Sequence, residues 1–362
     1  NLFFKKQNMK KKSLSAKKIK PNSFNFKKIL KDKKIFEIYK DFVKNFKNLN
    51  YSNKIAISVS GGPDSMALCF LVSCYKSQKN NKIQPIYYLV DHGLRKDSAE
   101  EAQQVKKQLK SKMISLKILR WKGKKPNSNL QSLARQKRYE LLFNECKKSN
   151  IKTILTAHHQ DDCYETFFSR LLRGSGTEGL SSFVETEKKF VFKRNVITVA
   201  RPLLSFSKQN LTYIANNVFS FYVDDPSNEM EKFQRVRLRK LISNLKNQGL
   251  DFHKLKLTLS NLASTNRAIN EIVNYNISKN VIFFNKKYLI SSKFFLLPEE
   301  VVFRSLSTLL FGGFHLDDHH RCRQPDPPYQ FVLHPSYFER HVFNLEVFCK
   351  PELQVSLLSL KA

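Results

Sequence analysis

Residues 55–65 read Ile-Ala-Ile-Ser-Val-Ser-Gly-Gly-Pro-Asp-Ser, and this stretch decides how the chain folds. The first five residues are typical of a short buried strand, and the apolar residues after Ser65 predict a helix up to about residue 76. Two glycines between a strand and a helix let the backbone turn tightly and bring its N–H groups close to an anion. We interpret the stretch as a phosphate-binding loop; the alternative is an ordinary strand-to-helix turn.

The loop differs from the two best-known phosphate loops. No Gly-Lys-Ser/Thr follows its glycines, so it is not a Walker A loop, and it lacks the three spaced glycines of dinucleotide-binding proteins. The hydroxyls of Ser60 and Ser65 can donate further hydrogen bonds. Asp64 would repel a bare phosphate, so its presence indicates a bridging Mg²⁺ or a water that it orients.

Strands and helices alternate along the first half of the chain. Strands are predicted at about residues 55–59, 83–90, 114–121 and 151–156, and helices at about 65–76, 97–112, 130–148 and 161–173. This alternation predicts an α/β fold, a parallel sheet flanked by helices with right-handed crossovers. Helical patterns dominate after Pro202, at about residues 208–217, 233–245, 252–277 and 299–310, with a short β-pair at 281–285 and 288–292. We therefore expect an α/β domain over 51–204 and a mainly helical second domain over 205–313.

The two ends of the chain differ in composition from the middle. Residues 1–50 are predicted to form a basic arm that continues, from Lys33, into an amphipathic helix. No lysine occurs from residue 294 to residue 349. We expect residues 314–362 to be an atypical tail produced by a frameshift or a chimaeric join, with no real metal site among its acids, histidines and cysteines.

Charge and cysteine usage narrow the class of protein. Lys and Arg number 64 against 30 acidic residues, a formal charge of +34. Such an excess suits a polyanion such as a nucleic acid, although a solubilising lysine-rich surface is the alternative. The six cysteines show no C-x-x-C spacing, which favours a reducing, cytoplasmic environment over a disulfide framework. No apolar run is long enough to cross a membrane.

A second group of polar residues follows the strand at 151–156. His158 is expected at the carboxyl edge of the sheet, where open α/β folds bind ligands. Asp162 and Glu165 are three residues apart at the start of a helix, so their side chains share one face. Two carboxylates there can hold Mg²⁺ or attract a substrate amine, although acids in a first helical turn also complement the helix dipole.

Other candidates come from the ends of strands and helices. Arg135 and its neighbour Arg138 share a helix face suited to phosphate, with a solvated basic face as the alternative. Arg170 is expected on the surface. His92 and Gly93 follow the second strand, and Arg173 and Gly174 close the helix at 161–173. A structural histidine and a helix-stopping glycine are the alternatives for these last positions.

Five segments resemble one known family. Residues 60–65 resemble the S-G-G-x-D-S signature of the N-type ATP pyrophosphatases, the PP-loop superfamily. The segments AHHQDDCYET with RLLRGSGTEGL, RPLL and DDPSN narrow the resemblance, and they begin at residues 157, 170, 201 and 224. In this order and spacing they resemble the tRNA(Ile)-lysidine synthetase family over about residues 53–313.

The resemblance implies a fold and a reaction. The fold would be adenine nucleotide alpha hydrolase-like, that is, Rossmann-like. The enzyme would be an ATP-dependent ligase that uses ATP and Mg²⁺ and acts on tRNA(Ile) with a CAU anticodon. It would adenylate the C2 carbonyl oxygen of the wobble cytidine, and the side-chain amine of free L-lysine would then displace AMP and leave lysidine.

The resemblance also implies roles for individual residues. The expected catalytic residues are Asp64, Asp162, Glu165, His158 and Arg135. The expected ATP-binding residues are Ser60, Gly61, Gly62, Pro63, Asp64, Ser65, His92, Arg173 and Gly174. The expected tRNA-binding residues are Arg235, Arg237, Arg239 and Lys240, and the expected Mg²⁺ ligands are Asp64 and Asp162. Val236 stands where the family has Asn, so this chain lacks that polar side chain.

Two alternatives remain open from the sequence. The first is a related PP-loop enzyme that thiolates a tRNA cytidine, although such enzymes need sulfur-carrying or cluster-holding cysteines and this chain has no C-x-x-C pair. The second is a basic RNA-binding protein without catalytic activity. Neither the oligomeric state nor the features that reject methionine tRNA follow from the sequence.

Overall fold

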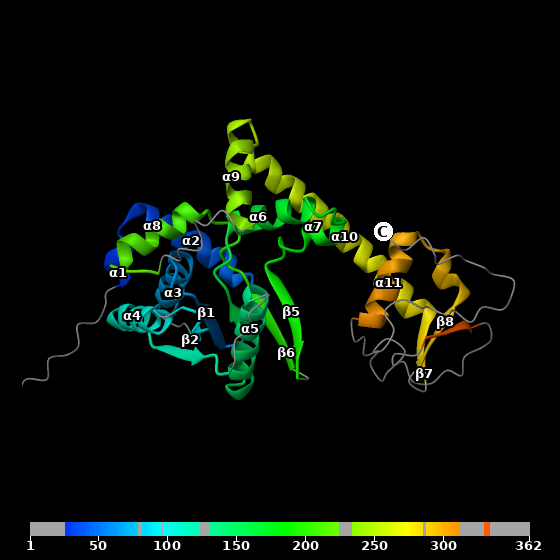
Figure 1. Cartoon of the computed structure of the whole chain (residues 1–362), viewed down its shortest axis with the longest axis horizontal. Helices are drawn as coiled ribbons and strands as arrows, with labels where there is room; N and C mark the ends of the chain where they lie inside the picture. The colour runs from blue at the N-terminus through cyan, green and yellow to red at the C-terminus, as the bar shows by residue number, and fades with distance from the viewer. Residues whose placement is uncertain are drawn as a thin grey trace, which may run out of the picture. The chain divides into compact units, whose positions relative to one another are not determined.

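The computed structural model describes residues 26–78, 82–95, 97–123, 130–193, 195–223, 234–284, 287–311 and 329–333 (Figure 1). Contacts divide the chain into two compact units. The first consists of residues 1–165 with 186–242, and the second of residues 166–185 with 243–362. None of the described helices combines the length and the hydropathy that a membrane span requires.

The first unit is built on a six-stranded sheet in the order β3-β2-β1-β4-β6-β5. The strands are β1 Lys54–Val59, β2 Gln84–Asp91, β3 Leu116–Arg120, β4 Thr153–Leu155, β5 Glu187–Phe192 and β6 Asn195–Ala200. Five of them run parallel in their pairings, and β5 pairs antiparallel with β6 at the edge. The predicted parallel sheet is therefore confirmed, and the β5–β6 hairpin is an addition that the sequence analysis did not foresee.

Helices cover both faces of this sheet. They are α1 Phe26–Ile29, α2 Lys33–Lys47, α3 Pro63–Lys76, α4 Ser98–Ser111, α5 Leu130–Lys148 and α8 Lys208–Val218. Two further helices, α6 Gln160–Leu171 and α9 Gln234–Asn247, begin in this unit and end in the second. On β1, Ile55 and Ile57 join one apolar cluster and Ala56 joins another, as the two-residue period of a strand requires. The first cluster includes residues of α2, α3, α4 and α8, and the second includes residues of α5.

Helix α2 belongs to this core. Asp32 caps its first turn by accepting a hydrogen bond from the Ile35 N–H at 2.9 Å. Phe42 and Phe46 are fully buried, and each contributes about 1.5–3 kcal/mol relative to an exposed position. The predicted amphipathic helix is thus confirmed, but it packs into the α/β unit. Residues 1–25 of the predicted arm lie outside the described residues.

The boundary expected near residue 204 is not where the contacts divide the chain. Leu211 and Ile214 of α8 are fully buried in the same cluster as Phe70 of α3. The apolar face of α8 is buried against α3. Residues 205–223 therefore belong to the first unit. Residues 166–185, which follow the first turns of α6, belong to the second.

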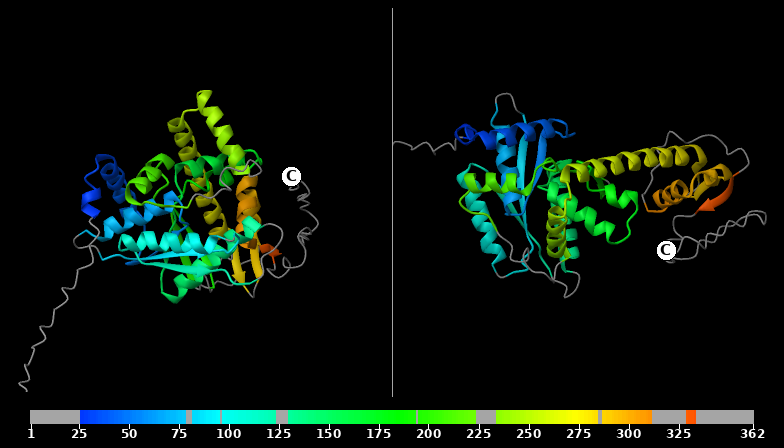
Figure 2. Two further views of the ribbon diagram at one scale, coloured as in Figure 1. Left: turned by 60° about the vertical axis from the view of Figure 1, so that its left-hand side comes forward. Right: turned by 90° about the horizontal axis from the view of Figure 1, so that it is seen from above.

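The second unit is mainly helical, as predicted. Its elements are α7 Thr177–Ser181, α10 Phe252–Asn280, β7 Val281–Phe284, β8 Lys287–Ser291, η2 Ser292–Leu296, α11 Glu299–Phe311 and β9 Tyr329–Leu333. The long α10 and the shorter α11 lie side by side (Figures 1 and 2). Ile277, Ile290 and Phe294 centre its core. Of the predicted atypical tail, the structure describes only β9, which pairs antiparallel with β8.

Candidate active site

The loop between β1 and α3 is built around Gly61. Its φ is +88°, a conformation that side-chain-bearing residues rarely adopt. A Cβ on Gly61 would also lie 2.8 Å from Val105 Cγ2 and 3.0 Å from Val223 Cγ2. Residues 60–65 therefore turn as predicted, and both conformation and space require glycine at this position.

The hydroxyl of Ser65 holds the loop in shape. It accepts hydrogen bonds from the N–H groups of Ser60 and Gly61, both at 3.1 Å, and donates one to the Gly62 carbonyl at 3.0 Å. Ser65 is only 2% exposed, whereas Ser60 is exposed. Both predicted serines take part in the loop, because the exposed Ser60 donates its hydroxyl to the Ser65 hydroxyl at 3.1 Å.

The loop opens directly into α3. Gly62 is its N-cap and Pro63 its first residue. Proline has no N–H, so the donors of this first turn that lack an intrahelical partner belong to Asp64 and Ser65. Helix N-termini attract anions. Asp64 Oδ1 is buried and has no hydrogen-bond partner among the described residues.

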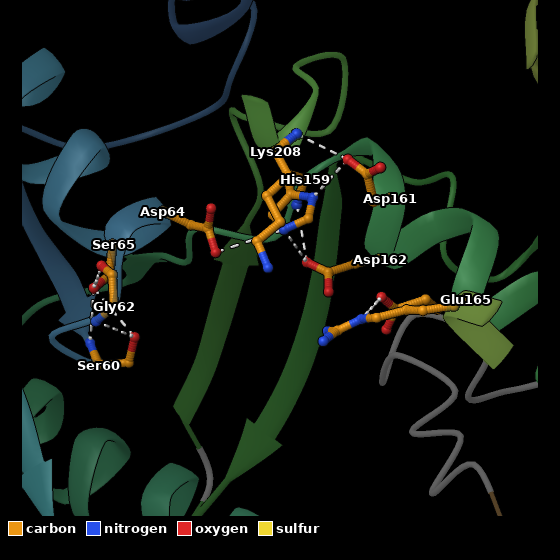
Figure 3. A network of polar contacts seen from close by, with 10 residues as sticks. Ser60, Gly62, Asp64, Ser65, His159, Asp161, Asp162, Glu165 and Lys208 are labelled. Carbon is orange, nitrogen blue, oxygen red and sulfur yellow. Dashed lines mark hydrogen bonds and ion pairs between the residues drawn. The ribbon is translucent and has the colours of Figure 1, made fainter. Parts of the chain in front are cut away.

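A buried histidine gathers carboxylates from the loop and from α6 (Figure 3). His159 is 5% exposed. Its Nε2 lies 3.6 Å from Asp64 Oδ2 and 3.7 Å from Asp162 Oδ2, and its Nδ1 lies 3.3 Å from Asp161 Oδ2. The His159 N–H also donates to Asp162 Oδ2 at 3.1 Å. Two of the predicted carboxylates, Asp64 and Asp162, therefore face the same imidazole.

This environment favours the charged form of the imidazole. Burial lowers the pKa of His159, but the neighbouring Asp161, Asp64 and Asp162 outweigh it and raise that pKa to about 10. A doubly protonated ring can donate toward carboxylates on both of its nitrogens. The imidazolium offsets the repulsion among three carboxylates that come together at the loop.

Glu165 forms an ion pair with Arg239 of α9. The Arg239 Nε lies 2.5 Å from Glu165 Oε1, and Glu165 is 5% exposed. Burial lowers the pKa of Arg239, while Glu165, Asp162 and Asp64 together raise it above its ordinary value. The second carboxylate oxygen, Oε2, is buried without a partner among the described residues. Glu165 can therefore accept one further donor while it holds Arg239.

The comparisons with known proteins agree with this geometry. Residues 32–245 match the PP-loop domain family. The chain belongs to the PP-loop family. Its predicted fold class is confirmed, since the structure superimposes on the U34-tRNA thiolase NcsA from Methanococcus maripaludis with a TM-score of 0.54. That match has 18% identity and covers 64% of this chain and 80% of the thiolase, so it carries the fold alone.

Curated relatives are more similar in sequence. A tRNA(Ile)-lysidine synthase of Wolbachia sp. subsp. Brugia malayi is 36% identical over 259 residues, which cover 71% of this chain and 59% of the relative. A second tRNA(Ile)-lysidine synthase, from Bradyrhizobium diazoefficiens, is 36% identical over 224 residues, which cover 62% of this chain and 61% of the relative. The resemblance stated from the motifs is therefore confirmed. The chain spans about three fifths of the length of these relatives.

The PP-loop site also contains residues that sequence reasoning did not select. His158, the predicted catalytic histidine, pairs through Nδ1 with the Thr156 hydroxyl at 2.8 Å, whereas its neighbour His159 contacts the carboxylates. Asp161 accepts a hydrogen bond from the Lys208 N–H at 2.8 Å and so fixes the start of α8. Adjacent histidines at the end of a strand were the available signal, but the sequence does not say which one turns inward.

The predicted His92 and Gly93 lie in the turn after β2, at the same sheet edge as the PP-loop. Asp91 orders this turn: its Oδ1 accepts from the Gly93 N–H and the Ser98 hydroxyl, both at 2.9 Å. The His92 ring meets Trp121 edge-on, with 6.1 Å between ring centroids. Asp91 was missed because an acid at a strand end is common in many loops.

Arg135 is exposed on α5, with its guanidinium 5.4 Å from the centre of the Tyr139 ring. No contact places it at the PP-loop among the described residues, and its catalytic role stays a prediction. Arg173 and Gly174 belong to the second unit. Arg237 and Lys240 are exposed on α9, and the side chain of Arg235 lies outside the described set.

Asp64 and Asp162 alone do not make a complete Mg²⁺ site. No group of three or more candidate ligands forms a metal site among the described residues. Mg²⁺ in nucleotide sites, however, is held by one or two carboxylates together with phosphate oxygens and water. Asp64, whose buried Oδ1 lacks a protein partner, and Asp162 suit that arrangement.

Proposed function

We propose that this chain is a tRNA(Ile)-lysidine synthetase of the PP-loop family, a carbon–nitrogen ligase. In the first step the C2 carbonyl oxygen of the wobble cytidine in a CAU anticodon attacks the α-phosphorus of ATP and releases pyrophosphate. In the second step the side-chain amine of free L-lysine attacks C2, loses a proton, and displaces AMP. The products are lysidine in the tRNA, AMP and pyrophosphate.

One observation carries this proposal. His159 lies within 3.7 Å of Asp64 from the PP-loop and of Asp162 from α6. The element that would bind ATP and the acidic helix that would attract an amine therefore meet at one buried group. The names of the relatives supply the substrates.

Each group has a task in this account. The turn at Gly61 and the first N–H groups of α3 cradle phosphate oxygens. Asp64 and Asp162 would hold Mg²⁺, which when bound neutralises the charge of the phosphates. Glu165, whose Oε2 lacks a partner among the described residues, attracts the lysine amine. Asp64 Oδ1, which has no partner among the described residues, is available for the ion. Binding of Mg²⁺ at Asp64 and binding of the lysine amine at Glu165 therefore use different carboxylate oxygens.

We infer that α9 contacts the tRNA backbone. Arg237 and Lys240 are exposed, while Arg239 of the same helix is bound to Glu165. Phosphate contacts of this kind position an RNA, and a separate pocket must read the splayed base. The substrates are those of the cytoplasm, where we expect the reaction to occur.

The thiolation alternative receives less support. Thiolation requires an accessible cysteine, and the four cysteines among the described residues, Cys69, Cys74, Cys146 and Cys163, are buried. Burial raises the pKa of the Cys146 thiol to about 12, which suppresses the thiolate needed for sulfur chemistry. These four cysteines are core residues.

The test is pyrophosphate release by the full chain with ATP, Mg²⁺, CAU-anticodon tRNA and lysine. We expect release to fall to background when the tRNA is omitted, and turnover to depend on lysine. Asp64→Asn should lower the rate by about a hundredfold or more, because it removes charge at the phosphates. Asp41→Asn, an exposed acid on α2, is the matched control and should leave the rate unchanged. Turnover that requires a sulfur donor in place of lysine would move the chain to thiolation.

A further inference from the structure

The His159 ring contacts Asp161, in the first turn of α6, through its Nδ1. Asp161 Oδ2 lies 3.3 Å from that nitrogen, and the same oxygen accepts the Lys208 N–H at 2.8 Å (Figure 3). Lys208 is the first residue of α8. One carboxylate oxygen therefore joins the imidazole to the start of another helix, and a rotation of the ring would break that link.

Helix α8 has a fixed place in the first unit. Its apolar face is buried in the same cluster as that of α3. A backbone hydrogen bond also ties the segment before α8 to the start of α6, since the Gln160 N–H donates to the Phe206 carbonyl at 2.9 Å. Packing and backbone hydrogen bonds therefore set the place of Asp161 relative to α3, the helix that carries Asp64.

The other nitrogen of the ring faces the PP-loop. His159 Nε2 lies 3.6 Å from Asp64 Oδ2 and 3.7 Å from Asp162 Oδ2. The Asp162 carboxylate is held in a second way, because its Oδ2 also accepts the His159 N–H at 3.1 Å. Among the described residues, the His159 ring is the one group that pairs with the Asp64 carboxylate. The ring therefore matters more for the position of Asp64 than for that of Asp162.

We propose that His159, oriented by Asp161, is a positioning residue that fixes the Asp64 carboxylate at the PP-loop. Asp161 contacts the ring at Nδ1 and the ring contacts Asp64 at Nε2, so the start of α8 sets the place of a carboxylate on α3. The proposal rests on the proposed function in one respect: Asp64 is taken to face the phosphates of ATP and their ion. His159 and Asp161 touch neither of these in this account, because they act through Asp64.

The first test compares turnover with ATP binding in His159→Gln, which keeps much of the side-chain volume and removes the ring. We expect kcat for lysine-dependent pyrophosphate release to fall about tenfold or more, because a small displacement at a reaction site costs up to about a hundredfold. The Kd for ATP with Mg²⁺, measured by calorimetry on the full chain, should change less than about threefold, because the N–H groups of the PP-loop remain. Equal losses of turnover and ATP affinity would show a merely structural role and overturn the proposal. His253→Gln, an exposed histidine on α10, is the control and should change neither.

Asp161→Asn tests whether Asp161 acts through the ring. Asparagine keeps an oxygen for the Lys208 N–H and removes the charge that faces His159 Nδ1, and the position is half-buried, so the variant should fold. We expect kcat to fall about threefold or more in the wild-type background, because a contact with a charged group is weakened. In the His159→Gln background the same change should lower kcat no further, since the ring is already gone. Losses that multiply in the double variant would contradict the proposal.

Thermal unfolding gives a readout that needs no catalysis. In the wild-type background Asp64→Asn removes a carboxylate that pairs with His159, and we expect the melting temperature to fall. In the His159→Gln background the same carboxylate has lost its partner and shares its surroundings with Asp162, so its removal should leave the melting temperature unchanged or raise it. An equal fall of the melting temperature in both backgrounds would show that the ring does not hold Asp64.

The melting temperatures also separate this proposal from the proposed function. If the wild-type chain modifies no tRNA, the proposed function fails, and the melting temperatures of the four chains still decide whether His159 holds Asp64. If the wild-type chain transfers lysine to tRNA but Asp64→Asn lowers the melting temperature equally in both backgrounds, the proposed function stands and the positioning role of His159 fails.

Discussion

At the scale of single residues, the PP-loop depends on one hydroxyl. Ser65→Ala would leave the N–H groups of Ser60 and Gly61 without their acceptor. Such a loss costs about 1–3 kcal/mol for each buried group left unsatisfied. We expect a lower melting temperature and weaker ATP binding, measured by differential scanning calorimetry and by titration with ATP. Ser52→Ala, which removes an exposed hydroxyl, should change neither, and normal ATP binding in Ser65→Ala would contradict the account.

The residue scale also shows what a sequence leaves undecided. Residues 60–65 were identified because strand, glycines and helix follow one another in the chain, and that order is local. The local order of residues does not distinguish His158 from His159, because both follow the same strand and precede the same helix. The inward direction of His159 depends on Asp64, nearly a hundred residues earlier, and on the turn that begins α6. Contacts between distant segments are the part that residue patterns do not contain.

At the scale of elements, Glu145 links α5 to the sheet through an ion pair with Lys117 of β3. Its carboxylate lies 2.6 Å from Lys117 Nζ of β3 and 2.9 Å from Lys148 Nζ. The hydrogen bond from Lys117 lowers the pKa of Glu145 below its ordinary value of 4.5. A lowered pKa adds stability above pH 4.5, the ordinary value, and that stability is lost as the pH falls through the folded-state pKa.

Glu145→Gln should therefore lower the free energy of unfolding at pH 7 by about 1 kcal/mol, since the lysines are largely exposed. The difference from the wild-type chain should shrink toward zero in acid, because the wild-type carboxyl then becomes neutral as well. Urea unfolding at both pH values measures this. Glu140→Gln, in a partly exposed pair with Lys137 on the same helix, should have little effect at either pH. If the free energies of unfolding of Glu145→Gln and the wild-type chain differed by the same amount at all pH values, the stabilisation by Glu145 would not be ionic.

Element prediction succeeded where periodicity is strong. The four parallel strands and the helices between them match the structure within a few residues, because buried strands and amphipathic helices repeat in a way that the sequence displays. The β5–β6 hairpin was missed because its exposed edge strand carries Lys188 and Lys189 and has no long apolar run. Edge strands are often charged in this way, which hides them from hydrophobic patterns.

At the scale of the whole molecule, the formal charge of +34 predicts salt-dependent RNA binding. Replacing Arg237 and Lys240 with Gln should reduce the slope of log affinity against log salt by about 0.7–0.9 for each phosphate that the variant no longer neutralises. Filter binding of CAU-anticodon tRNA at several salt concentrations measures the slope. Lys152→Gln, exposed before the amino end of β4, is the control. An unchanged slope in the α9 variant would show that Arg237 and Lys240 do not contact the tRNA phosphates.

Domain limits were the least predictable feature at this scale. The sequence changes character after Pro202, yet α8 returns to pack on α3, and residues 166–185 join the later helices. Composition records which residues are apolar, but it does not record which apolar faces meet. The unit boundaries follow from that pairing.

The most direct measurement is the transfer of labelled lysine to tRNA. The full chain is incubated with ATP, Mg²⁺, labelled L-lysine and either CAU-anticodon tRNA or the same tRNA with a different wobble base. We expect label in the CAU tRNA alone, at the wobble nucleoside, with one AMP formed for each lysine incorporated. Formation of AMP and pyrophosphate without lysine in the tRNA would contradict it.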